Sequence, residues 1–199
     1  RGESLLTDTG KPHEGYPADY WEPVEGGTRY DRYVVLHSLG HSVPYVNGTK
    51  QAPGREFAAG VIDREEGEGR ERLSLALAGA YPAAAGLSEL RRDLTLKRGS
   101  PGRVVVEDQA TFAEPDRDNE AESVLVSYCP MAEVDGGIAV EGESGTAHVR
   151  TDADVRIERV ESPVTASPVH RARFGMPVDG DEASIRFEID IGATSKRHL

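Results

Sequence analysis

The chain has 199 residues, 37% of them hydrophobic, and a formal net charge of −12. This length suits one domain of ordinary size. The acidic balance argues against general binding to nucleic acid or to an anionic membrane, because both need clustered Lys and Arg. No apolar run approaches the roughly 18 residues that predict a transmembrane helix. Cys129 is the single cysteine, which excludes a disulfide within the chain.

The ends of the sequence predict a piece of a longer protein. The chain opens at Arg1 without the charged and apolar segments of a signal peptide. We expect one domain over residues 1–192 and a polar tail over residues 193–199.

Strand patterns dominate, as short apolar runs and as alternation with a period of two. The clearest alternation places Ile185, Phe187 and Ile189 on one face of a strand. A Gly-Ser-Pro-Gly turn at residues 99–102 predicts a hairpin. In chain order we expect strands at residues 33–36, 57–62, 73–77, 90–96, 102–107, 123–129, 137–140, 147–149, 155–160, 170–174 and 183–191.

Helical periodicity is nearly absent. The alanine-rich segment 76–90 is interrupted by Gly79, Pro82 and Gly86, so it allows at most one short helical turn. Roughly a dozen strands with turn-rich connections predict an all-β fold with little helix: a large antiparallel β-sandwich of two sheets.

One carboxylate and one imidazole lie at the ends of predicted strands. Residues 5–10 predict a short buried strand that ends in Asp8 and a glycine turn. His41 is expected at the start of a strand that leads into an Asn47-Gly48 hairpin turn. Such a pair can supply two ligands to one divalent metal. The alternative is that Asp8 caps a turn and His41 is a core histidine with satisfied hydrogen bonds. His13 and His37 are weaker ligand candidates.

The segment from Gly10 to Arg32 is rich in aromatic residues and has no strand period. It contains Tyr16, Tyr20, Trp21 and Tyr30. Long ordered loops of this kind are usually functional. Two interpretations stay open: the rings grip sugar, or they plug one end of a sandwich.

Five segments, read in order, resemble the C-terminal β-sandwich domain of the heparinase II/III-like polysaccharide lyases. Together they cover about positions 3–113. They are LLTDTG (5–10), Arg29-Tyr30, HSLGHSVPYVNGTKQ (37–51), LALAGAYPAAAGLSELRRDLTL (75–96) and VVVEDQATF (104–112).

The resemblance implies a partner domain and a metal. In that family an N-terminal helical toroid packs on the sheets, and the lyase site lies between them. A structural zinc near this cleft would fall on Asp8 and His41. Its further histidine ligand, and most catalytic groups, would belong to segments preceding this chain. Tyr20 and Tyr30 resemble cleft tyrosines in position, and we expect them to contact substrate.

Three functions follow from these patterns. The resemblance implies the sheet domain of a lyase that cleaves uronic-acid polysaccharides by β-elimination, and we expect this domain to be inactive when isolated. Alternatively it is a non-catalytic carbohydrate-binding sandwich, or an architectural one. Expected partners are an acidic polysaccharide, the toroid and possible further copies of the chain. A lyase parent implies a secreted or periplasmic protein.

Overall fold

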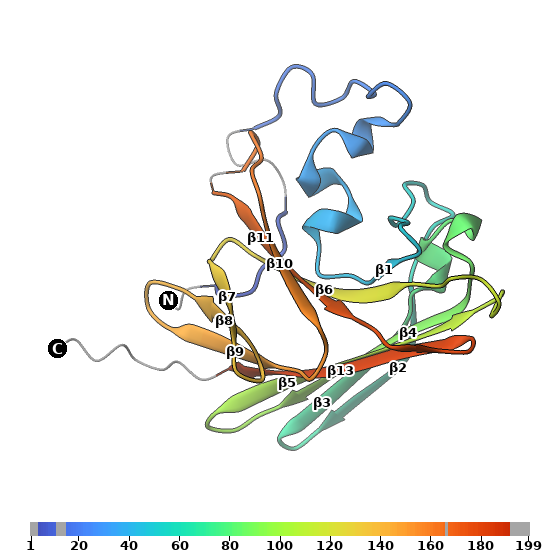
Figure 1. The fold of residues 1–199 in the computed structure, drawn as a ribbon. Helices are drawn as coiled ribbons and strands as arrows, with labels where there is room; N and C mark the ends of the chain where they lie inside the picture. The colour runs from blue at the N-terminus through green and yellow to red at the C-terminus, as the bar shows by residue number, and fades with distance from the viewer. Residues whose placement is uncertain (1–3, 11–14, 166, 192–199) are drawn as a thin grey trace.

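The computed structural model describes residues 4–10, 15–165 and 167–191, and these form two antiparallel sheets (Figure 1). This confirms the predicted all-β sandwich. The four-stranded sheet has the order β1 (Tyr45–Val46), β6 (Ala121–Ser127), β11 (Val169–Gly175) and β10 (Val155–Val160).

The second sheet has nine strands, and its long central strands form the floor of the molecule (Figure 1). A two-residue strand, β12 (Val178–Asp179), pairs with β13 beside the main path. The order along that path is β2 (Gly60–Gly67), β3 (Arg70–Ala76), β4 (Leu87–Lys97), β5 (Gly102–Phe112), β13 (Glu182–Ile191), β9 (Thr146–Arg150), β8 (Gly137–Glu141) and β7 (Met131–Val134).

Helix is confined to five single turns of 3-10 geometry in the described residues. Two of them, η4 (Ala78–Ala80) and η5 (Ala83–Ala85), occupy the alanine-rich segment, where Gly86 ends the second turn at φ +67°. The other three, η1 (Arg29–Asp31), η2 (Val34–Leu36) and η3 (Ser38–Gly40), form a separate N-terminal region above the four-stranded sheet (Figure 1).

The main core lies between the two sheets. Phe174 of β11 stacks on Phe187 of β13, with ring centroids 5.0 Å apart. The predicted alternation is confirmed, since Ile185, Phe187 and Ile189 are all buried. Burying such side chains contributes about 1.5–3 kcal/mol each, so contacts of this kind hold the sheets together.

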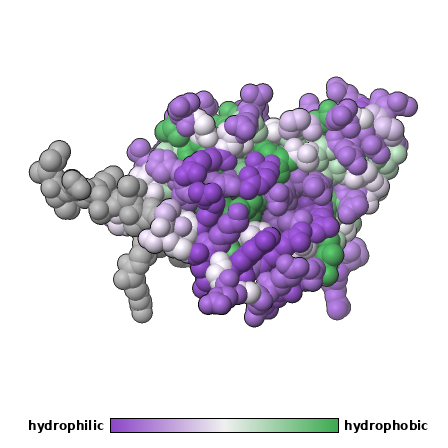
Figure 2. All heavy atoms as spheres, turned by 90° about the horizontal axis from the view of Figure 1, so that it is seen from below, coloured by the Kyte–Doolittle hydropathy of each residue, from purple (hydrophilic) through white to green (hydrophobic). Residues whose placement is uncertain are grey.

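The opposite face of the nine-stranded sheet is covered by charged side chains (Figure 2). Arg103 lies 2.6 Å from Glu188 and 3.1 Å from Asp190. Arg91 contacts Asp93 at 2.9 Å. Paired charges alternating with core residues give this face its water-exposed character.

One ion pair lies inside the sandwich. Arg92 is only 7% exposed and grips the fully buried Asp108 with two hydrogen bonds of 2.6 and 2.7 Å. The same guanidinium donates to the hydroxyl of Ser123 on β6 and to the carbonyl of Ser42. The pair therefore joins both sheets to the segment that carries His41.

The nine-stranded sheet ends at β7 on one side and at β2 on the other. Strand β2 has eight residues, all of them exposed. Its pairing with β3 is interrupted by a bulge between Val61 and Asp63. Three charged residues, Arg64, Glu65 and Glu66, follow the bulge.

Four strand predictions differ from the structure. Residues 34–36 of the predicted strand 33–36 form η2, because their backbone turns to bury Val34 and Val35 in a small second core. Residues 5–9 form no strand and touch β6 through one backbone bond, Thr7 N–H to Val126. Strand β2 begins only at Gly60. The short strand β7 carried no clear pattern.

The Asn47-Gly48 turn is confirmed, with φ of 49° and 66°. It does not begin a long hairpin, because β1 pairs with β6 and meets Thr49 through a single bridge. His41 accordingly lies in a turn before β1, four residues ahead of Tyr45. The side chain of Asn47 is bonded to Ala85 and to Asn119, which fixes the turn.

Removing one partner of the buried ion pair should destabilise the fold strongly. We expect Asp108→Ala to lower the free energy of unfolding by about 3–5 kcal/mol, because Arg92 keeps its charge without a counterion. Urea titration followed by circular dichroism measures this loss. The double change Arg92→Met with Asp108→Leu should restore much of the lost stability.

The control is Glu71→Ala, which breaks an exposed pair with Arg98 and should lower the free energy of unfolding by under about 1 kcal/mol. Equal losses for Asp108→Ala and Glu71→Ala would contradict this.

Candidate functional site

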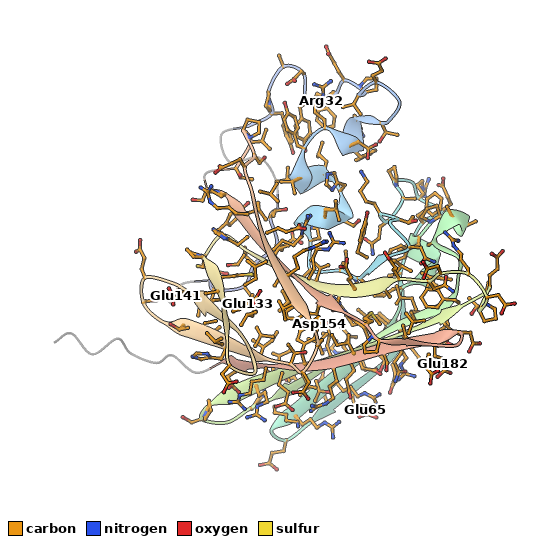
Figure 3. The ribbon with its side chains drawn as sticks, in the orientation of Figure 1. Arg32, Glu65, Glu133, Glu141, Asp154 and Glu182 are labelled. Carbon is orange, nitrogen blue, oxygen red and sulfur yellow. The ribbon has the colours of Figure 1, made fainter. Side chains whose placement is uncertain are left out.

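A pocket of about 630 Å³ lies beside the N-terminal region, between η1, η3 and the chain that follows β1. Arg32, labelled in that region in Figure 3, holds the loop through Asp19 at 2.8 Å. Glu65 marks the distant edge of the nine-stranded sheet in the same view. The titratable residues that line the pocket are Tyr30, Asp31, His37, His41 and Lys50.

Asp8 and His41 meet at one side of this pocket. The Nδ1 atom of His41 lies 2.6 Å from a carboxylate oxygen of Asp8, and the other oxygen accepts the Gly10 N–H at 2.8 Å. Partial burial of the carboxyl disfavours its charge, but these hydrogen bonds outweigh it and hold the pKa of Asp8 below 3.8. An ionised Asp8 orients the ring of His41 through Nδ1.

The backbone around His41 is fixed from three directions. The carbonyl of Leu39 accepts a bond from Arg171, that of Gly40 from Thr9, and that of Ser42 from Arg92. A side chain on Gly40 would come within 2.2 Å of the Val34 carbonyl, so only glycine fits there. The imidazole therefore sits on a rigid support.

A second charged pair, Asp31 and Lys50, lies across the pocket. Bonds from the Lys50 ammonium and the Thr28 N–H lower the pKa of Asp31 to about 2. Lys50 therefore faces a permanent carboxylate, and it brings a cation to the lining.

His37 lines the same pocket from the start of η3. Its Nδ1 atom is buried with no hydrogen-bond partner among the described residues. Burial lowers the pKa of His37 to about 4, helped by the nearby charges of Lys50 and Arg171. Its ring is therefore neutral at pH 7. The 3-10 turn η3 lies between His37 and His41, so the two histidines are not on one straight strand.

Of the two predicted substrate-contact tyrosines, Tyr30 lines the pocket and Tyr20 does not. The Tyr30 hydroxyl accepts a hydrogen bond of 2.7 Å from Arg29. Tyr20 is 5% exposed and lies among the rings of Tyr16, Trp21 and Tyr33. His13 lies outside the described residues.

The described residues supply only part of a zinc site. In them no three His, Cys, Asp or Glu side chains gather as possible metal ligands. Asp8 and His41 have the right donor types, but their facing atoms are 2.6 Å apart. Two ligands of a tetrahedral zinc stand about 3.3 Å apart. The pair as it stands is a hydrogen bond, and it would have to open to chelate a metal.

Sequence reasoning missed Asp31 and Lys50 as pocket residues, and it missed Arg29 as the hydrogen-bond donor to Tyr30. Arg29 and Tyr30 form one of the five segments that resemble the lyase family, and this resemblance was a sequence signal for the pair. The contact between Asp31 and Lys50 had none, because it joins a 3-10 turn to a loop 19 residues later. Nothing in the described chain is a helix of the length and hydrophobicity needed to cross a bilayer.

The two sheets form a β-sandwich that has counterparts among solved structures. Among solved structures, the chain is similar to a crystal structure of heparinase III, with a TM-score of 0.60 and 14% identity over 87% of this chain. A second heparinase III structure, with methylated lysines, gives a TM-score of 0.69 and 11% identity over 98% of this chain. The crystal structure of the heparan sulfate lyase HepC from Pedobacter heparinus gives a TM-score of 0.57 and 12% identity over 78% of this chain.

These similarities establish the fold and bear out the resemblance at that level. The chain spans 24–29% of the length of those three proteins. No family model matches the chain, and no curated protein does.

The buried imidazole of His37 should make stability depend on pH. Between pH 6.5 and about 4 the unfolded chain takes up a proton that the folded chain refuses. The free energy of unfolding should therefore fall as the pH is lowered through this window. We expect His37→Phe to weaken that fall, as measured by urea titrations at several pH values. His148→Phe, at an exposed site on β9, is the control and should leave the pH dependence unchanged. A wild-type slope retained in His37→Phe would disprove this origin.

Proposed function

We propose that residues 1–192 are the sheet domain of a polysaccharide lyase that cleaves uronic-acid polymers by β-elimination. The observation that carries this proposal is the pocket itself. On a heparinase-like fold it brings together a tyrosine hydroxyl bonded to a guanidinium, a carboxylate-bound imidazole and a lysine.

Elimination from a uronate needs three chemical contributions. The substrate carboxylate must be neutralised, the proton at C5 must be removed, and the leaving oxygen must be protonated. Lys50 would serve the first task by exchanging its Asp31 partner for the substrate carboxylate. Tyr30 is our candidate for proton transfer, because the Arg29 guanidinium stabilises negative charge that develops on its oxygen.

His41 has a positioning role in this proposal. Asp8 holds its Nδ1 atom, and three side chains hold its backbone. Such a ring can orient substrate or a group of a second domain at the pocket. The remaining catalytic groups would come from a helical toroid of the same protein, which is the partner that the proposal requires.

We also propose zinc at Asp8 and His41 when a third ligand comes from that longer protein. Bound there, the metal would fix the two segments that carry its ligands and add positive charge near the pocket. The donor types support this proposal, while the present pair alone offers too few ligands for tight binding.

A second candidate function is carbohydrate binding without catalysis. It is favoured by the exposed rings of Tyr16 and Trp21, which lie outside the pocket lining. The two functions differ in Tyr30: catalysis depends on its hydroxyl, whereas simple binding at exposed rings does not.

Lyase activity should require the longer protein and the Tyr30 hydroxyl. We expect the toroid-bearing protein to release unsaturated uronate from an acidic polysaccharide, detected by ultraviolet absorbance, and the 199-residue chain to release none. Tyr30→Phe should lower kcat by about 10²–10⁴-fold. Tyr45→Phe is the control, since Tyr45 does not line the pocket and its hydroxyl donates to the Gly48 carbonyl. Full turnover by Tyr30→Phe would rule out its proton-transfer role.

Zinc affinity should depend on His41 only in the longer protein. Calorimetry should give weak binding to the 199-residue chain and much tighter binding once the third ligand is present. His41→Ala should then weaken the affinity at least about tenfold, because one of few ligands is lost. His148→Ala serves as the surface control. Equal affinity in wild type and His41→Ala would refute the assignment.

A further inference from the structure

Two exposed rings form a platform at the outer end of the N-terminal region. Tyr16 is 52% exposed and Trp21 is 54% exposed. Their ring centroids are 5.3 Å apart, with planes inclined by 43°. We call Tyr16, Trp21 and the adjacent Arg29 the aromatic platform. Large exposed aromatic groups of this kind mark binding surfaces more often than scattered apolar residues do.

The platform is held rigidly from below. Tyr20 is buried and packs against both rings. Its ring centroid lies 4.4 Å from that of Tyr16 and 4.8 Å from that of Trp21. It stacks on Tyr33, whose hydroxyl donates to Asp19 at 2.8 Å. Asp19 in turn is paired with Arg32. A preformed surface loses little conformational entropy when a ligand binds.

Arg29 gives the platform a positive charge. Its guanidinium lies 4.7 Å from the ring centroid of Trp21 and 4.7 Å from that of Tyr30. Across residues 4–10, 15–165 and 167–191, no carboxylate is recorded in an ion pair with it. The guanidinium is therefore able to accept an anionic group from outside the chain.

The same residue connects the platform to the pocket. Arg29 donates to the hydroxyl of Tyr30, and Tyr30 lines the pocket with His41 and Lys50. Arg29 therefore contacts both Trp21 of the aromatic platform and Tyr30 of the pocket lining. Continuity of this kind favours an extended ligand over an isolated small molecule.

We propose that the aromatic platform is an outer subsite for an anionic pyranose unit of a polysaccharide. The C–H face of the sugar stacks on Trp21, and its carboxylate or sulfate binds Arg29. The inference rests on the proposed function, which it extends beyond the reacting residues. Arg29 supplies the charge complementarity that selects an acidic sugar over a neutral sugar or an apolar protein surface.

Trp21 is the only tryptophan in the chain, so its fluorescence reports on this surface alone. The experiment titrates the 199-residue chain with uronic-acid hexasaccharides from heparan sulfate and from alginate. We expect a saturable change in emission with at least one of them and a much smaller change with the neutral cellohexaose. Calorimetry on the same samples gives the dissociation constants.

Variants test the two contacts separately. Trp21→Ala and Arg29→Gln should each raise the dissociation constant at least about fivefold, as losses at a central contact do. Arg70→Gln is the matched control, because Arg70 is an exposed arginine at the start of β3. Circular dichroism checks that each variant keeps its fold. Calorimetry measures Trp21→Ala, which lacks the fluorescent ring.

The outcomes separate this subsite from the proposed lyase function. Hexasaccharide binding by calorimetry with unchanged Trp21 emission, and with both variants binding like wild type, would overturn the subsite and leave the lyase proposal standing. Equal binding of cellohexaose would overturn the anionic specificity. Absence of any hexasaccharide binding would also overturn the subsite, while the Tyr30 turnover assay decides the lyase proposal independently.

Discussion

The buried pair of Arg92 and Asp108 is the interaction on which the rest of the structure depends. A buried guanidinium must have every donor satisfied, so its partners are fixed in position once the sheets close. Those partners come from β5, from β6 and from the Ser42 carbonyl. One charge thereby sets the spacing of the two sheets and the place of the segment that presents His41. The interior of the sandwich and the support of the pocket therefore share this contact.

Local patterns in the sequence were enough to predict the sandwich. Alternation is a property of neighbouring residues, so the strand with Ile185, Phe187 and Ile189 could be recognised without knowing its partners. The Asn47-Gly48 turn was visible for the same reason. The strand predicted at residues 33–36 was wrong, because a short apolar run is equally compatible with a buried 3-10 turn and with a strand.

The pocket was harder to predict because its contacts are not local. Asp8 and His41 were paired by their strand-end positions and by the resemblance, and the structure does bring them into contact. Their role as metal ligands stays a prediction. Nothing local in the sequence indicated the partner of Arg92, which is Asp108, 16 residues away on the next strand. Tyr20 illustrates the same limit: its burial follows from three rings whose packing no spacing rule reveals.

The exposed strand β2 has a consequence for how this domain exists among its own copies. An open edge presents unpaired N–H and C=O groups, and a neighbouring chain could extend the sheet there. The bulge at Val61 and the charges of Arg64, Glu65 and Glu66 interrupt such a template. Two copies aligned edge to edge would have to desolvate these charges and match an irregular backbone. The β2 edge is therefore a poor template for pairing with a second copy of the chain.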